Sequence, residues 1–115
     1  MTDYSQGKIY KIIDIDTGSV FIGSTVQTME KRMSKHVEHF KSYSKGKGKF
    51  MTAFKVMKNN NFQMELIEDY PCKSRNELEL QELYWTNEID CVNKVKTNDL
   101  DELGKPKHRY YKHYN

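Results

Sequence analysis

The sequence is short of cysteine, proline and long apolar runs, and these shortages exclude several classes of protein. Its two cysteines, Cys72 and Cys91, form neither a CxxC pair nor a zinc-type cluster with histidine, which argues against a disulfide scaffold and a zinc site. No apolar segment approaches the roughly 20 residues of a membrane-spanning helix. The polar N-terminus has no signal-peptide core. We therefore expect an intracellular protein, cytoplasmic or nuclear according to its host, with no membrane partner.

Motifs of three common enzyme classes are also missing. The chain contains no GxxxxGKS/T phosphate loop, no HExxH zinc-protease helix and no GxSxG nucleophile turn. A phosphate-loop NTPase, a zinc protease and a serine hydrolase are therefore unsupported, and nothing in the sequence indicates a small-molecule organic cofactor.

Length and composition indicate one small globular domain. The 115 residues suit a single domain with a modest core, and 37% hydrophobic with 30% charged residues is typical of a folded chain. A net charge of +3 and a pI near 8.8 are compatible with a polyanionic partner without proving one. Periodicity fades towards the C-terminus, which predicts a domain over 1–96 and a basic, aromatic tail over 97–115. We expect a monomer or a weak dimer.

The hydrophobic pattern indicates an α+β domain in which a small three-stranded antiparallel sheet is flanked by helices. Runs of β-branched and aromatic residues predict the strands, and apolar residues at steps of three and four predict the helices. Thr28 and Ser74 are expected N-caps. In β-β-α-α-β-α order, the expected elements are strands over 7–15 and 20–23, helices over 28–42 and 50–58, a strand over 62–68 and a helix over 74–89, with an extended segment at 91–93.

Glu82 stands in an unusual place on the last predicted helix. It falls on the same stripe as Leu78, Trp85 and Ile89. A carboxylate there is costly unless it pairs with a cation, holds a metal or keeps access to water. The alternative is that the edge of the stripe reaches solvent at Glu82, as we expect for Glu79 further round the helix.

Arg32 and His36 raise a similar question on the first predicted helix. They are four residues apart and face the same way, beside the apolar stripe that contains Met33. A guanidinium and an imidazole together would suit a phosphate, although an ordinary solvated face has the same spacing. Tyr10 lies in the middle of the first strand, where a tyrosine is usually a packing residue with a wet hydroxyl.

Taken in order, these residues resemble the GIY-YIG endonuclease family. The first signature triplet is Lys8-Ile9-Tyr10 and the second is Phe21-Ile22-Gly23, with their aromatic residues eleven positions apart. No single triplet is specific, but the ordered set spans roughly residues 7–93. The remaining matches are Ser24-Thr25, Glu30-Lys31-Arg32, His36, Asn61-Phe62, Glu82 with Trp85, and Asn93.

The resemblance implies a metal-dependent DNA endonuclease that hydrolyses phosphodiester bonds, with a role for each matching residue. Glu82 would bind one divalent cation, Mg²⁺ or Mn²⁺. Arg32 would hold the scissile phosphate. Tyr10 would orient or deprotonate the attacking water, His36 would join that hydrogen-bond network, and Asn93 would brace the site.

The main departure from the family pattern is Phe21, where most members have tyrosine. Phenylalanine keeps the ring and loses the hydroxyl, which would lower the rate on the order of 100-fold or more if that group did acid–base work. One alternative function is therefore a nucleic-acid-binding domain of the same fold with weakened or lost catalysis. A third possibility is a protein-interaction module. The basic loop at residues 42–49 and the basic tail argue against it.

Lysine and arginine side chains supply most non-specific affinity for nucleic acid. The tail mixes them with tyrosines that can stack on bases, although a tail without a role fits the sequence as well. With no appended recognition module, we expect a weak or short sequence preference. The candidate phosphate contacts are Lys8, Lys11, Lys31, Lys35, Lys45, Lys47, Lys49, Lys107 and Arg109.

Overall fold

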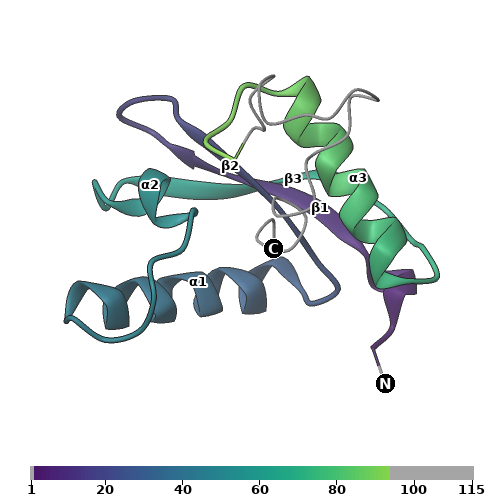
Figure 1. Cartoon of the computed structure of the whole chain (residues 1–115), viewed down its shortest axis with the longest axis horizontal. Coiled ribbons are helices and arrows are strands. Elements are labelled where there is room, and N and C mark those ends of the chain that lie inside the picture. Colours follow the sequence, from purple (N-terminus) through teal and green to yellow (C-terminus); the bar gives the residue numbers. More distant parts are fainter. Residues whose placement is uncertain (1, 94–115) are drawn as a thin grey trace, which may run out of the picture.

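The computed structural model describes residues 2–93, which form one antiparallel sheet and the helices around it (Figure 1). The strands pair in the order β2-β1-β3, so β1 is central and β2 is an edge strand. This architecture confirms the predicted α+β fold. The elements are a short 3₁₀ turn (Tyr4–Gln6), β1 (Lys8–Asp14), β2 (Val20–Thr25), α1 (Met29–Ser44), α2 (Phe54–Met57), β3 (Phe62–Asp69) and α3 (Arg75–Glu88).

A tight turn joins β1 to β2 and sets their register. Gly18 has a φ of 78°, a left-handed conformation that glycine adopts without strain. Asp14 stabilises the turn, because its backbone N–H bonds the Ser19 carbonyl at 2.8 Å and its carboxylate accepts the Asp16 N–H at 3.0 Å. The resulting register places Tyr10 directly opposite Gly23.

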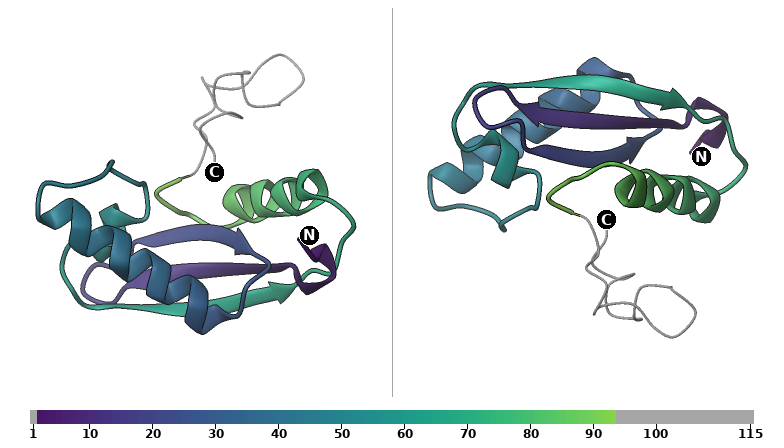
Figure 2. Two further views of the ribbon diagram at one scale, coloured as in Figure 1. Left: turned by 90° about the horizontal axis from the view of Figure 1, so that it is seen from below. Right: turned by 90° about the horizontal axis from the view of Figure 1, so that it is seen from above.

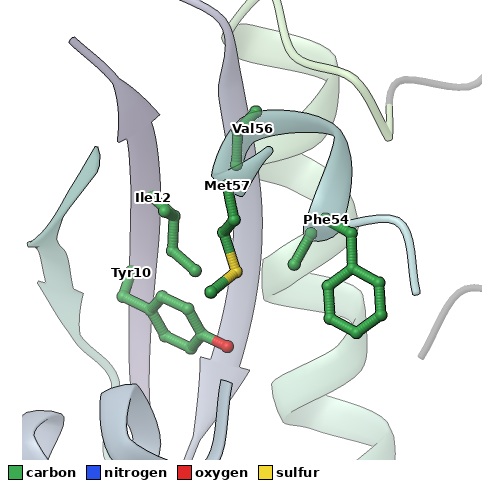
Figure 3. Packing of buried hydrophobic residues seen from close by; sticks show 6 residues of the cluster. Tyr10, Ile12, Phe54, Val56 and Met57 are labelled. Atoms are coloured by element: carbon green, nitrogen blue, oxygen red, sulfur yellow. The ribbon is translucent and has the colours of Figure 1, made fainter. Parts of the chain in front are cut away.

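The sheet separates two hydrophobic cores, with α1 and α3 on opposite sides of it (Figures 1 and 2). On one face, Tyr10 and Ile12 pack against α2, as Figure 3 shows, and against apolar residues of α1. On the other face, Ile9 and Ile22 pack against Leu78 and Trp85 of α3. Alternate residues of β1 therefore face different helices, which is why the strand reads as nearly continuous apolar sequence.

A β-bulge interrupts the pairing of β3 with β1. Ile9 pairs with Glu68 and Tyr10 with Leu66, which leaves Ile67 as the extra residue. As a result, Ile67 joins the α3 core and the Glu68 carboxylate also reaches α3, where it accepts hydrogen bonds from Trp85 Nε1 at 2.9 Å and Gln81 Nε2 at 2.7 Å. Leu66, which strict alternation would put on the same face as Phe62 and Met64, remains about half exposed.

Both long helices begin where their caps predict. The Thr28 hydroxyl accepts the Lys31 N–H at 3.2 Å, and the Ser74 hydroxyl accepts the Glu77 N–H at 3.2 Å. The Glu77 carboxylate reaches back to the N–H of Lys73 instead of Ser74. Among residues 2–93, no helix is long and apolar enough to cross a membrane.

The prediction of a helix over 50–58 was too long. α2 covers only 54–57, because the turns that lead into it use bonds between residues three apart: Phe54 to Met51, Lys55 to Thr52 and Val56 to Ala53. Such 3₁₀-type bonding holds only short segments. In contrast, β2 and α1 each extend two residues beyond their predicted ends.

The extended segment expected at 91–93 is a turn instead of a strand. It nevertheless bonds the free edge of β2, since the Val92 N–H donates to the Val20 carbonyl at 2.7 Å and the Asn93 side chain pairs with the backbone of Ile22. These bonds satisfy groups that an edge strand would otherwise leave open. The predicted tail lies outside the described residues.

The placement of the α3 stripe can be tested with two leucines of the same helix. Leu78 is buried and Leu80 is about half exposed. We expect Leu78→Ala to lower the free energy of unfolding by about 2–5 kcal/mol and Leu80→Ala to change it by about 0.5 kcal/mol or less. Urea denaturation would measure both values. Equal losses of unfolding free energy in the two variants would show that the buried face of α3 does not contain Leu78.

Candidate active site

A cleft of about 650 Å³ opens beside the edge strand β2. Neighbouring residues of β2 contribute to it from opposite faces of the sheet, because β2 is an edge strand of the sheet that the described residues form. One wall comes from residues 48–53, before α2. The polar and aromatic side chains around the remainder are Tyr10 of β1, Phe21 and Ser24 of β2, Arg32, His36, His39 and Ser42 of α1, and Glu82 of α3.

The Tyr10 hydroxyl lies at the centre of a buried hydrogen-bond network. It is 2.7 Å from His36 Nε2 and accepts a hydrogen bond from Arg32 Nε at 3.1 Å. Arg32 and His36 reach it together because they are one helical turn apart on α1. Tyr10 and His36 are fully buried. Tyr10 is therefore a packing residue, as one interpretation of the sequence expected, but the wet hydroxyl of that interpretation is wrong.

Gly23 allows the Tyr10 ring to lie in this position. The two residues are opposite each other in the β1–β2 ladder. A Cβ atom on residue 23 would overlap the Tyr10 hydroxyl and lie 2.5 Å from Cζ. The glycine of the second signature triplet is therefore required by close approach, since its backbone has no positive φ.

His36 is a neutral imidazole enclosed by aromatic rings. Tyr10 and Phe21 meet it edge-on, with ring centroids at 5.8 Å and 5.9 Å. Burial, together with the charges of Arg32 and His39, lowers the pKa of His36 to about 3. His36 Nδ1 has no hydrogen-bond partner within the part of the chain that the structure describes.

Glu82 is a buried carboxylate beside this network. Its side chain is 3% exposed, and it accepts a hydrogen bond from Ser24 Oγ at 2.6 Å. Burial raises the pKa of Glu82 to about 7, with the Glu79 charge adding to the rise and Ser24 and Arg32 opposing it. The alternative that Glu82 reaches solvent is therefore wrong, whereas Glu79 pairs with Arg75 at 3.4 Å.

Opposing charges act on the Tyr10 phenol. Burial raises the pKa of Tyr10, Arg32 lowers it by charge and hydrogen bonding, and Glu82 raises it. The net direction is upward, so the phenol keeps its proton at neutral pH. Neutralising the Glu82 carboxylate would remove one of the two causes of that rise.

The donor set at Glu82 fits a hydrated divalent cation and does not fit an all-protein metal cage. No group of three or more His, Cys, Asp or Glu side chains within residues 2–93 is arranged to hold a metal. One oxygen ligand in a polar cleft suits Mg²⁺, which keeps several of its waters, and does not suit Zn²⁺.

The predicted nucleic-acid contacts divide into three groups. Lys45, Lys47 and Lys49 lie exposed in the loop after α1, where Lys49 lines the cleft. Lys31 and Lys35 are exposed on α1 away from the cleft. In the third group, Lys8 bonds the carbonyls of Gln6 and Gln27, and Lys11 pairs with Glu65. The two remaining candidates, Lys107 and Arg109, lie outside the described residues.

A comparison with protein-family models shows the family of this chain. The model of the GIY-YIG catalytic domain matches residues 6–94, which is most of the chain. The protein belongs to the GIY-YIG catalytic-domain family. It therefore has a nuclease domain whose family hydrolyses phosphodiester bonds, and the expected resemblance is confirmed.

Two solved structures share the fold. The catalytic domain of the homing endonuclease I-TevI is 21% identical, with a TM-score of 0.53 over 87% of this chain and 95% of that one. A mutant of that domain, with one glutamate replaced by alanine, is 20% identical, with a TM-score of 0.55 over 88% and 91% of the two chains. No curated protein matches.

The structure brings together in one cleft the central residues that the sequence singled out, which are Tyr10, Arg32, His36 and Glu82. It also adds residues to which the sequence analysis gave no role. Asn93 lies behind β2, where its side-chain amide bonds the Ile22 backbone. Ser24, which holds Glu82, received no role in the sequence analysis. The sequence could have indicated this contact, because side chains alternate between the two faces of β2. When Phe21 and Gly23 face α1, Ser24 faces α3.

The raised pKa of Glu82 predicts a pH-dependent cost to stability. An ordinary glutamate has a pKa of 4.5 and the folded value is about 7, so stability falls as pH rises between these values and stays lower above them. We expect metal-free Glu82→Gln to be more stable than wild type at pH 8, on the order of 1–3 kcal/mol. This advantage should vanish below about pH 4.5.

Denaturant melts in EDTA at pH 4.5 and pH 8 would measure the difference. The lowered pKa of His36 acts in the opposite direction, but His36 is present in both proteins and cancels. Glu79→Gln is the matched control on the same helix and should gain nothing at either pH. A Glu82→Gln gain that is equal at both pH values would contradict the buried, ionised carboxylate.

Proposed function

We propose that the protein is a metal-dependent endonuclease that hydrolyses phosphodiester bonds in DNA. The observation that carries the proposal is a buried carboxylate, Glu82, sharing one cleft with the Tyr10–Arg32–His36 network. Both similar structures are described as domains of a homing or intron endonuclease, which supports DNA as the substrate.

Arg32 is the proposed phosphate ligand. None of the ion pairs within residues 2–93 involves it, and only its Nε is bonded to Tyr10. The remaining guanidinium N–H groups can therefore bond a phosphate oxygen, where the charge of the transition state develops. Tyr10 fixes the angle at which the guanidinium enters the cleft.

Glu82 is the proposed ligand of Mg²⁺ or Mn²⁺. When bound, such a cation polarises the phosphate and stabilises the leaving oxygen. Ser24 prepares the site, because its hydrogen bond fixes the Glu82 carboxylate and favours the ionised form.

Tyr10 is better suited to orient the attacking water than to take its proton as a free base. Its own pKa is raised, and His36, with a pKa of about 3, accepts a proton with difficulty. The Tyr10–His36 hydrogen bond instead fixes the hydroxyl, so that a water beside it meets the phosphate held by Arg32. Asn93 braces β2 beneath this arrangement.

The alternative of a binding domain without catalysis has no specific observation in its favour. Keeping Glu82 ionised at 3% exposure costs stability, and a binding domain gains nothing from that cost. Buried groups that destabilise a fold are typical of sites that carry out chemistry.

Cleavage of supercoiled plasmid tests the proposal. We expect nicking or linearisation that requires Mg²⁺ or Mn²⁺, stops in EDTA and falls about 100–1,000-fold or more in Glu82→Gln. Glu79→Gln should cleave like wild type. Mg²⁺ should also raise the melting temperature of wild type and leave that of Glu82→Gln unchanged. A folded, DNA-binding wild type that leaves plasmid intact would rule out the enzyme.

Phe21 allows a separate prediction. Because its ring packs edge-on against His36, we expect the ring to matter more than the missing hydroxyl. Phe21→Ala should lower kcat about 10-fold or more, as misplacement of a catalytic group does, and Phe21→Tyr should stay within about 10-fold of wild type. Single-turnover cleavage would measure both, and a 100-fold rise in Phe21→Tyr would show that this hydroxyl is required.

A further inference from the structure

The wall of the cleft formed by residues 48–53 carries an exposed aromatic side chain that the proposed chemistry does not use. Phe50 is 52% exposed and lines the cleft together with its neighbour Lys49. A half-exposed phenylalanine contributes little to a core, and from its place in the cleft its exposed surface can contact a bound molecule.

The protein holds the Phe50 ring in place from behind. Phe50 meets Tyr43 and Phe54 edge-on, with centroid distances of 5.7 Å and 5.9 Å. Phe54 is buried, and Phe40 packs against it at 5.4 Å. These four residues form an aromatic cluster, and Figure 3 shows Phe54 beside Met57 in the core. The Phe50 ring crosses the planes of these two rings at 68° and 90°, and about half of its side chain stays exposed to a partner in the cleft.

The surroundings of Phe50 favour an anionic partner. The chain contains no Asp or Glu between Glu38 and Glu65, and Lys45, Lys47 and Lys49 lead directly into Phe50. All three lysines are exposed. An aromatic face beside lysines matches single-stranded nucleic acid, in which bases stack on rings while the phosphates pair with cations.

We propose that Phe50 stacks on an unpaired base next to the scissile phosphate, so that the enzyme prefers DNA with an unpaired stretch at the cut. In an intact duplex each base face is covered by its neighbours, so a protein ring must open the stack before it can contact a base, and this costs less in an unpaired stretch. The cleft, at about 650 Å³, is in the range of about 300–1,000 Å³ that encloses small ligands. This inference rests on the proposed nuclease function and names its substrate class.

The test measures binding in EDTA, where no strand is cut. Fluorescence anisotropy would compare wild type and variants on an intact duplex and on the same sequence with a central single-stranded gap. We expect Phe50→Leu to weaken binding to gapped DNA about 10-fold and to leave duplex binding unchanged, whereas Phe50→Tyr should bind like wild type. Tyr84→Leu is the control, because Tyr84 is 49% exposed on α3 and outside the cleft.

Photocrosslinking gives a second measurement that uses the wild-type protein. A 5-iododeoxyuridine in the gap should crosslink to Phe50, as identified by mass spectrometry of the DNA-linked peptide. Equal effects of Phe50→Leu on both DNAs, no effect on either, or a crosslink elsewhere would overturn the proposal.

Both results can be separated from the nuclease proposal. One outcome is a crosslink at Phe50 and a loss of gapped-DNA binding in Phe50→Leu, without cleavage in Mg²⁺. It would support the stacking site and contradict the nuclease function. The opposite outcome is Glu82-dependent cleavage with no selective effect of Phe50→Leu on binding to gapped DNA. It would support the nuclease function and contradict the stacking site.

Discussion

The hydroxyl of Tyr10 is the point on which the arrangement of the site depends. It bonds two side chains of α1 while its ring lies over Gly23 of β2, so one residue of the central strand aligns the helix and the neighbouring strand. The contact works only because residue 23 has no side chain. These bonds fix the conformations of the Arg32 and His36 side chains in the cleft.

Glu82 is placed by a different set of contacts. α3 packs on the opposite face of the sheet, and the bulge at Ile67 turns Glu68 towards it. There the Glu68 carboxylate holds Trp85 and Gln81, the neighbours of Glu82 along the helix. Ser24 then completes the placement from the edge strand. The site therefore joins two halves of the molecule that are built on separate cores.

These contacts leave polar groups in costly environments. Glu82 is buried with a raised pKa, and His36 Nδ1 finds no partner among the described residues. Each costs stability that an apolar side chain would not. The two cores supply the compensating burial, since Ile9, Ile12 and Ile22 are completely enclosed. A fold with an apolar core on each side of a small sheet can therefore hold a polar cleft at its edge.

Much of this could be read from the sequence, because local rules govern it. Runs of β-branched and aromatic residues predicted the strands, helical spacing put Arg32 beside His36 and Glu82 on an apolar stripe, and the caps Thr28 and Ser74 marked the starts of α1 and α3. The bulge at Ile67, the shortness of α2 and the bond from Ser24 to Glu82 could not be read in this way, because they depend on packing between residues distant in the chain. Burial itself is the clearest case: the sequence put Tyr10 on a strand, but only the closure of α1 over the sheet buried its ring and brought its hydroxyl to Arg32 and His36.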